Sequence, residues 1–412
     1  MKERLISVDI FRGITIMLMT IVNNPGDWGN VFPPLLHAKW HGATPTDMVF
    51  PFFLFIVGVS IVLASPNPEF TNDSFKKLLV RSLRIFTLGL FLNFFSKIQL
   101  FGLESYSLLA IRLVITGIVA YLLLTNYDRQ KQLYAVLAVL IIMLLLAYLA
   151  EPFSDVRIPG VLQRIAIVYF IVALLYHKVS LKVMAGIGVV LLLGYWAAMA
   201  LIPVNGVTGN FAANENVAAM IDRVFLEGHM WISSKTWDPE GLFSTIPAVG
   251  TGILGVFAGL VLTKKRSQNG WDLLIYGGLA LVLLGFGWNK LFPINKALWT
   301  SSFVVYTAGL ACLSLALIQY LTETVKWEGW TKPFIIFGVN PMLVFFFSGI
   351  IPRVLSTIKV SGKGFQEFVY KDVLNSIFEN AKMASLSWAI LYLVFWFLIL
   401  LWFYRKKIIV KV

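Results

Sequence analysis

The sequence predicts an all-α protein, a polytopic integral membrane bundle of about twelve transmembrane helices. Composition is the first observation behind this prediction. The 412 residues are 58% hydrophobic, with a mean hydropathy of +0.80. Only 13% are charged, whereas soluble domains carry about 25%. The second observation is that the apolar residues fall into repeated runs of about 20, the length that a helix needs to cross a bilayer.

Twelve such runs follow one another along the chain. The first comes after Lys2 and Arg4, as in a signal peptide. It contains Asp9 and Arg12, however, and ends at Asn23-Asn24-Pro25-Gly26 without a small-residue cleavage site, so we expect a retained helix. The expected helices lie near 9–25, 47–64, 77–95, 106–125, 132–150, 159–177, 181–202, 245–263, 271–292, 299–321, 333–354 and 386–404.

Lysines and arginines in the short loops predict the orientation of the bundle. With twelve crossings, basic loops such as Lys264–Arg266 and Arg405–Lys407 fall on one side, which the positive-inside rule makes cytoplasmic together with both termini. The net charge of +13 is then a topology signal, and we expect no nucleic-acid partner. The opposite side carries two long extracytoplasmic segments, 203–244 and 353–385. Loops of this length without a strong helical pattern are usually functional or disordered.

Four polar clusters lie at the predicted outer ends of helices. The richest places His37 and Asp47 in a short connection between two apolar runs. Titratable groups near a bilayer are costly, so such a cluster indicates a site, and imidazole suits proton transfer near neutral pH. The clusters are His37–Asp47, with Lys39, Trp40 and His41; Arg157–Gly160 with Gln163 and Arg164; Asp238–Gly241; and Pro293–Lys296 before Trp299.

Two pairs of charged residues have both structural and functional interpretations. Arg157 and Arg164 are seven residues apart, which predicts a shared helical face. Arg164 would lie at depth, where it needs an anionic or carbonyl partner. The structural interpretation is an internal ion pair with a carboxylate such as Glu240. Asp9 and Arg12 are spaced to pair on one face of the first helix, either to fix that helix or to take part in binding.

The aromatic residues and the histidines also allow more than one interpretation. Trp231 and Trp237 stand beside carboxylates, an arrangement that suits a sugar or another polar ligand but equally an interfacial aromatic belt. His37 and His41 have the spacing of helical zinc ligands, yet the prolines and glycine around them argue against a helix. We therefore expect no metal site. Cys312 lies within an apolar run and is expected to be a packed core thiol.

Six motifs, in order along the chain, resemble heparan-α-glucosaminide N-acetyltransferase and its bacterial relatives. The first element also resembles the wider transmembrane acyltransferase group. The resemblance covers nearly the whole chain. It implies a single transmembrane acyltransferase domain over 1–412, in a bacterial inner membrane, with 106–150 as an inserted helix pair. The motifs are Arg4–Gly13, the His37 loop, Asp47–Pro51, Arg157–Arg164, Asp238–Ile246 and Asn295–Trp299.

The resemblance implies transfer of an acetyl group from cytosolic acetyl-CoA to the amine of an amino sugar or glycan end outside the membrane, by an enzyme that is plausibly a homodimer. It makes His37 catalytic with Asn23 beside it, and Asp47 would orient the imidazole. His41 stands where the lysosomal enzyme has an asparagine, which leaves the acceptor open. The residues expected to bind substrate or donor are Asp9, Arg12, Trp40, Arg157, Gln163, Arg164, Asp238, Glu240, Asn295, Lys296 and Trp299.

Two questions stay open at this point. His37 is either a general base or a nucleophile that forms an acetyl-histidine intermediate. The alternative function is a secondary transporter of a sugar or another polar solute, which intramembrane charges and Gly/Pro-rich helix ends also fit. A non-catalytic membrane scaffold is the third possibility.

Overall fold

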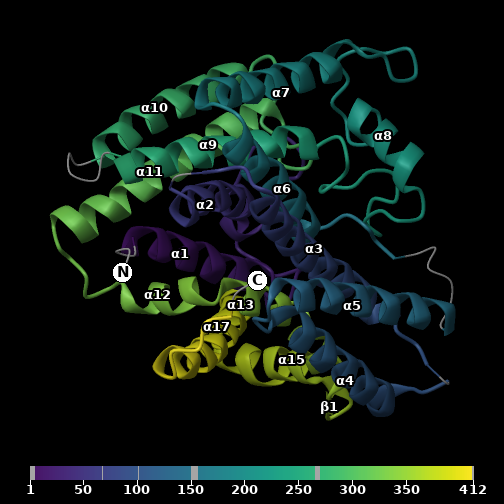
Figure 1. Cartoon of the computed structure of the whole chain (residues 1–412). Helices are drawn as coiled ribbons and strands as arrows, with labels where there is room; N and C mark the ends of the chain where they lie inside the picture. The colour runs from purple at the N-terminus through teal and green to yellow at the C-terminus, as the bar shows by residue number, and fades with distance from the viewer. Residues whose placement is uncertain (1–4, 67, 101, 150–155, 265–269, 411–412) are drawn as a thin grey trace.

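The computed structural model describes residues 5–66, 68–100, 102–149, 156–264 and 270–410. Over these residues the protein is a helical bundle with one two-stranded hairpin (Figure 1). The basic residues Lys2, Arg4, Lys265 and Arg266, which entered the orientation prediction, lie outside the described residues. The all-α prediction is confirmed.

The helices follow the apolar runs closely. The main ones are α1 (Ile6–Val22), α2 (Val49–Ala64), α3 (Asn72–Phe94), α4 (Ser105–Leu124), α5 (Arg129–Leu149), α6 (Val161–Lys178), α7 (Leu181–Leu201), α8 (Val217–Leu226), α9 (Thr245–Lys264), α10 (Trp271–Trp288), α11 (Ser301–Gln319), α12 (Lys332–Val339), α13 (Pro341–Ser348), α14 (Ile351–Thr357) and α17 (Ala381–Arg405).

Ten helices of the described chain are long and apolar enough to cross a membrane, and a bent pair makes an eleventh candidate. This is fewer than the twelve expected. The first run forms α1, which has 17 residues and falls just short of a full span. The run at 333–354 is not the single straight helix we expected. It breaks at Asn340, and the two halves, α12 and α13–α14, meet at a bend of 73°. Pro341 explains the break because it has no N–H to continue the helix.

The two long segments contain short elements that the sequence did not predict. Segment 203–244 holds the amphipathic helix α8. Segment 353–385 holds most of α14, the hairpin β1 (Lys359–Val360) with β2 (Lys363–Gly364), α15 (Phe365–Phe368), a π-helical turn at 369–374 and α16 (Asn375–Ile377). Such short elements carry little periodicity, so a hydropathy pattern does not reveal them.

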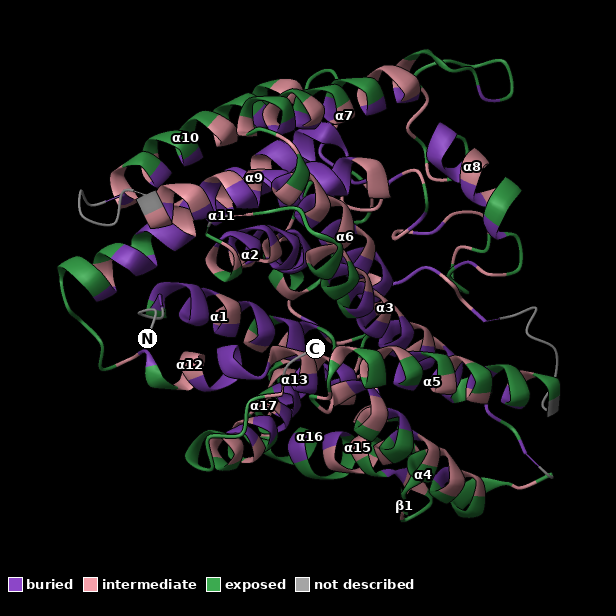
Figure 2. Ribbon diagram, viewed as in Figure 1, coloured by how far each residue is buried: buried purple, intermediate pink, exposed green. Residues whose placement is uncertain are grey.

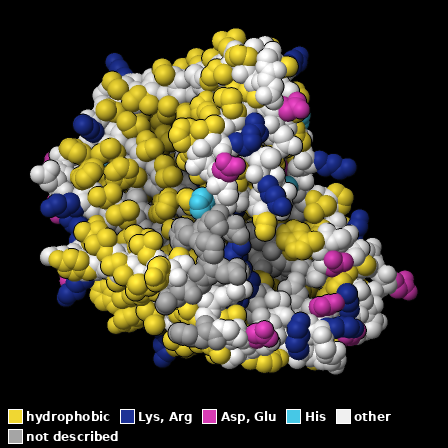
Figure 3. Space-filling view, turned by 90° about the vertical axis from the view of Figure 1, so that its right-hand side faces the viewer, with side chains coloured by type: hydrophobic (Ala, Val, Ile, Leu, Met, Phe, Trp, Pro, Cys, Tyr) yellow, Lys and Arg dark blue, Asp and Glu magenta, His cyan; other side chains and the backbone are white. Residues whose placement is uncertain are grey.

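Buried helices form the centre of the bundle, and exposed apolar helices surround it. In Figure 2, α1, α2 and α9 are largely buried, while α7, α10, α4 and α5 expose their outer faces. On the side of the molecule seen in Figure 3, hydrophobic side chains cover much of the left-hand half, and most of the charged side chains lie over the right-hand half. Exposed apolar faces on helices of this length are what a bilayer requires.

Glycine allows two pairs of central helices to pack backbone against backbone. A Cβ atom at Gly255 in α9 would lie 2.1 Å from the carbonyl oxygen of Phe55 in α2. A Cβ atom at Gly13 in α1 would lie 1.8 Å from the carbonyl oxygen of Phe334 in α12. Small residues at such contacts are the usual device for close helix packing in membranes. These contacts hold α1 and α2, the two helices that flank the His37 loop.

We predict that Gly255→Ala destabilises the protein by about 1–3 kcal/mol, the typical cost of overpacking a core. Backbone atoms of α2 stand in the way, and they cannot rotate aside as a side chain would. Gly277→Ala in α10 is the matched control, because a Cβ atom there meets nothing within 4 Å. Thermal unfolding of the purified variants in one detergent measures the difference. Equal unfolding temperatures would contradict this packing.

Candidate active site

The side chains of His37 and Asp47 form a hydrogen-bonded pair between α1 and α2. His37 Nδ1 lies 2.7 Å from Asp47 Oδ1. The other oxygen, Asp47 Oδ2, accepts hydrogen bonds from the backbone N–H groups of Ala38 and Thr44, at 3.0 and 2.9 Å, and from the Thr44 hydroxyl at 3.0 Å. A carboxylate accepts only, so Nδ1 carries the ring proton and Nε2 is the acceptor. This is the geometry of a base oriented by a carboxylate.

The local sequence places Asp47 in this position. Pro45 begins a 3-10 turn, Pro45–Met48, which leads directly into α2. Thr44 caps this turn, and Thr44 and Asp47 satisfy each other's backbone N–H groups in a capping box. The same carboxylate therefore caps the start of the helical turn and holds the imidazole. As expected from the prolines and the glycine, the segment from His37 to His41 is not helical.

Gly42 joins the His37 loop to the turn that carries Lys296. Its φ of +99° is one that other residues rarely adopt, and its N–H donates to the carbonyl of Ile294 at 2.7 Å. Lys296 Nζ then lies 3.2 Å from both His37 Nδ1 and His37 Nε2. A point equidistant from both nitrogens lies over the ring face, because in the ring plane it would collide with Cε1. The in-plane lone pair of Nε2 is therefore directed away from the ammonium.

A cavity of about 510 Å³ adjoins the His37–Asp47 pair; we call it the outer cavity. Asn23, the exposed C-cap residue of α1, lies on its wall. The structure thus brings the three predicted catalytic residues to one cavity. Its polar lining residues and tryptophans are Asn23, His37, Lys39, Trp40, Thr46, Asp47, Arg157, Trp231, Trp237, Glu240 and Lys296.

Three tryptophans form an aromatic wall of the outer cavity. The ring centroids of Trp40 and Trp237 are 5.1 Å apart, and those of Trp231 and Trp237 are 6.1 Å apart, both edge to face. Trp40 Nε1 donates to the carbonyl of Phe211 at 2.8 Å, which fixes its ring. Rigid aromatic rings of this kind offer large flat apolar surfaces with little conformational freedom to lose on binding.

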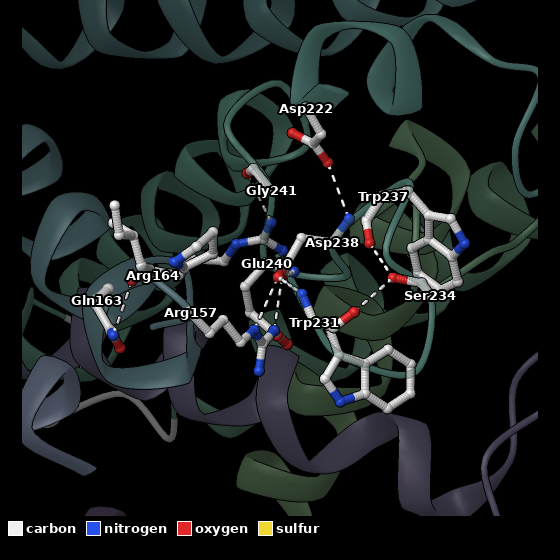
Figure 4. Close-up of polar contacts among 12 residues, drawn as sticks. Arg157, Gln163, Arg164, Asp222, Trp231, Ser234, Trp237, Asp238, Glu240 and Gly241 are labelled. Carbon is white, nitrogen blue, oxygen red and sulfur yellow. Dashed lines mark hydrogen bonds and ion pairs between the residues drawn. The ribbon is translucent and has the colours of Figure 1, made fainter. Parts of the chain in front are cut away.

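Arg157 binds both acidic residues of the third cluster (Figure 4). Its Nε donates to Asp238 Oδ2 at 2.8 Å and its Nη2 to Asp238 Oδ1 at 2.6 Å, a bidentate pair, and Nη2 also reaches Glu240. Burial alone would lower the pKa of Arg157, but these two carboxylates raise it. Burial would likewise raise the pKa of Glu240, and the surrounding Arg157, Arg164 and Lys296 lower it. Both groups are therefore charged.

One expectation about the arginines was wrong. Because α6 begins at Val161, Arg157 lies before the helix and does not share a helical face with Arg164. Of the two partners considered for Arg164, the carbonyl is the one that it contacts, whereas Glu240 pairs with Arg157. Arg164 is 1% exposed, donates from Nη2 to the carbonyl of Gly241 at 3.1 Å, and stacks over the Trp299 ring at 5.1 Å. Arg164 thus does not line the outer cavity but contacts the loop at Gly241 and the ring of Trp299.

Asp222 is a supporting residue that the sequence analysis missed. This buried residue of α8 accepts hydrogen bonds from the backbone N–H groups of Asp238 and Leu242, at 3.1 and 3.0 Å, and so holds the loop that carries Glu240. Burial raises the pKa of Asp222 to about 6. Its only signal in the sequence is one acidic residue on a short amphipathic helix.

A second cavity, of about 700 Å³, lies further along the same helices; we call it the inner cavity. Asp9, Arg12 and Ile16 of α1 line it, whereas Met19, Val22 and Asn23 of the same helix line the outer cavity. Arg12 donates to Asp9 Oδ1 at 3.3 Å, so the predicted pair forms. The charged residues on the inner wall are Asp9, Arg12, Lys77, Arg81, Arg84 and Arg129, five cations against one carboxylate.

The two cavities meet at two phenylalanines. Phe53 of α2 and Phe345 of α13 line both of them. From Arg12 to Asn23, α1 rises about 16 Å, so the cavities are stacked along the bundle and not side by side. A bent or extended ligand that passed these rings would reach from the cationic wall to His37.

The predicted binding residues thus separate into three groups. Trp40, Arg157, Glu240 and Lys296 line the outer cavity. Asp9 and Arg12 line the inner cavity instead. The remaining five line neither. Gln163 donates to Ile158 O, Asp238 holds Arg157, Asn295 accepts from Leu298 N–H, Trp299 Nε1 donates to Thr251, and Arg164 stacks on Trp299.

Comparison with known proteins agrees with the motifs. The family model described as "Heparan-alpha-glucosaminide N-acetyltransferase, catalytic" matches residues 4–158, the part that contains α1, the His37 loop and α2. Human heparan-alpha-glucosaminide N-acetyltransferase is 30% identical over 402 aligned positions, which cover 84% of this chain and 52% of the relative. The mouse enzyme is 27% identical, with coverage of 83% and 53%.

The chain spans about half the length of these relatives. The match nevertheless extends over most of the chain and well beyond the part that the family model covers. On this similarity, the chain belongs to the heparan-alpha-glucosaminide N-acetyltransferase family.

Proposed function

We propose that this protein is a transmembrane N-acetyltransferase of a bacterial inner membrane. It moves an acetyl group from acetyl-CoA, bound from the cytoplasmic side, to the amine of an amino sugar or glycan end on the extracytoplasmic side. The observation that carries the proposal is the His37–Asp47 pair, 2.7 Å apart, at a cavity that adjoins a second, cationic one. The similarity to named N-acetyltransferases supports it.

The proposed reaction uses the acceptor nitrogen of His37. The neutral amine of the sugar attacks the thioester carbonyl carbon, and His37 Nε2 takes the amine proton as the C–N bond forms. The tetrahedral intermediate then expels the CoA thiolate as the C–S bond breaks, and the imidazolium returns the proton to the sulfur. Asp47 stabilises that imidazolium through Nδ1. In the competing scheme Nε2 itself attacks the carbonyl and carries the acetyl group.

Two groups are placed to stabilise the oxyanion of the intermediate. Lys296 Nζ lies 3.2 Å from His37 Nε2, within reach of a carbonyl oxygen presented to that nitrogen. Burial and, to a smaller extent, Arg164 lower the pKa of Lys296, and the carboxylates of Glu240 and Asp47 offset only part of this effect. The amide of Asn23 lines the same cavity. Donors fixed in a cavity with little water stabilise a developing charge more than they would in water.

The inner cavity suits the donor. CoA carries several phosphates, and five cationic side chains line this cavity. Arg81 is held over the Tyr169 ring at 4.8 Å, and Arg84 donates to the carbonyls of Leu123 and Thr125, so these cations are fixed in place. With the nucleotide on this side, the pantetheine arm would pass between Phe53 and Phe345. The tryptophan wall of the outer cavity would then receive the sugar.

We predict that His37→Ala lowers acetyl transfer by about 10²–10⁴-fold, the usual contribution of a general base. The side chain is 51% exposed, so its loss should leave the fold intact. The assay gives purified protein labelled acetyl-CoA and a panel of amino sugars. His41→Ala in the same loop is the control and should keep most of the activity, since His41 does not line the outer cavity. Near-normal turnover by His37→Ala would overturn the proposal, and uptake of unmodified sugar into vesicles would favour a transporter.

We predict that Asp47→Asn lowers kcat by about 10²–10⁴-fold with little change in KM, because it changes the tautomer of His37. The oxygen of the substituted amide would keep the hydrogen bonds from the N–H groups of Ala38 and Thr44. The amide NH₂ would then face His37 Nδ1. The ring must then accept at Nδ1 and carry its proton on Nε2. Steady-state kinetics measures this effect, with Thr46→Ser, also on the cavity wall, as the control. An unchanged kcat would show that Asp47 has only a structural role.

A further inference from the structure

The chain reverses direction after the last helix, α17. The N–H of Ile408 donates to the carbonyl of Phe403 at 2.9 Å, and the N–H of Lys407 donates to the carbonyl of Tyr404 at 3.0 Å. These two bonds define a Schellman motif, and Lys407 takes its left-handed position with a φ of +55°. A lysine at this φ is conformationally unfavourable, so other contacts must hold the residues that follow.

Asn340 provides those contacts. It lies at the break between α12 and α13 and is 1% exposed. Its Nδ2 donates to the carbonyl of Ile408 at 3.0 Å, and its Oδ1 accepts from the N–H of Val410 at 2.7 Å. The tail thus satisfies both polar atoms of a buried amide. If the tail left, that amide would lose both partners, which is costly in a buried position.

The same tail residues form part of the wall of the inner cavity. Ile409 and Val410 line it together with Arg12 and Arg81 and with the helix-break residues Val339 and Pro341. Ile409 is also 47% exposed, so it lies where the cavity meets the surroundings. Residues 406–410 therefore lie across an edge of the inner cavity, attached through Asn340 to the break in the α12–α14 span.

We propose that residues 406–410 form a strap that closes the inner cavity over its ligand, with Asn340 as the residue that positions it. The strap must detach for the ligand to leave, so the two Asn340 hydrogen bonds slow ligand exchange. This inference takes the identity of the ligand, CoA, from the proposed function. The closure of the cavity by the strap does not depend on that function. Asn340 and the strap do not contact the His37–Asp47 pair, so they act on binding and not on the acetyl transfer step.

Val410→Pro tests the strap, because proline removes the N–H that Asn340 Oδ1 accepts. Val410→Ala is the matched control: it also shortens the side chain but keeps the N–H. We expect labelled CoA to dissociate about fivefold faster from Val410→Pro than from Val410→Ala, the effect of one hydrogen bond. Equal dissociation rates would contradict the proposal that residues 406–410 close the cavity.

A second readout needs no CoA. Met342 lines the inner cavity, and Cys312 is buried, so Met342→Cys adds one reporter thiol. Val410→Pro should speed its labelling by a water-soluble maleimide several-fold, and Val410→Ala should not. If native protein does not bind CoA, the proposed donor is wrong, yet the labelling rates still test the strap. Equal labelling rates in the two variants would overturn it.

A second pair of variants acts at the turn and leaves Asn340 and Val410 intact. Lys407→Val places a β-branched residue at a left-handed φ, which it tolerates poorly, and should release the strap. Lys407→Asn removes the same charge, but asparagine accepts this conformation, so the strap should stay closed. Faster labelling of the Met342→Cys thiol in Lys407→Val alone supports the strap, and the same rate in both variants would overturn it.

Discussion

The rest of the site depends on the carboxylate of Asp47. One oxygen is hydrogen-bonded to His37. The other accepts hydrogen bonds from two backbone N–H groups and a hydroxyl of the loop that bends around it. A carboxylate that is 1% exposed is tolerated only when its lone pairs are satisfied. The fold of this loop therefore places the His37 imidazole at the start of α2. The fold of the loop and the geometry of the His37–Asp47 pair share one cause.

The packing of the bundle gives this pair its surroundings. Glycine contacts bring α1 against α12 and α2 against α9. These contacts fix the positions of α1 and α2, the two helices that flank the loop. The break at Asn340 and the bulk of Phe53 and Phe345 then leave two spaces in series instead of one continuous channel. Charged groups at such depth are costly unless paired. Several of them have partners here: Arg12 contacts Asp9, Arg157 binds two carboxylates, and Arg164 contacts a carbonyl and an aromatic face.

Hydropathy and loop chemistry predicted much of this from the sequence. The apolar runs located the helices to within a few residues, and the cost of polar groups between them singled out His37 and Asp47. Pairings between distant segments were not predictable, since Arg157 meets Asp238 across 81 residues of chain. The break at Asn340 does have a local signal, Asn-Pro within an apolar run, but the run length dominated the prediction. The separation of Asp9 and Arg12 from the outer cavity follows from the length of α1, which rises about 16 Å between Arg12 and Asn23.

The central claim is that donor and acceptor meet across the membrane, from opposite ends of two stacked cavities. Proteoliposomes with the protein in one known orientation test it most directly, with labelled acetyl-CoA in one compartment and an amino sugar in the other. The account predicts that acetylated sugar forms only when acetyl-CoA is on the side of the inner cavity and the sugar is on the side of the outer cavity. Product that forms only when both substrates share a compartment would contradict it.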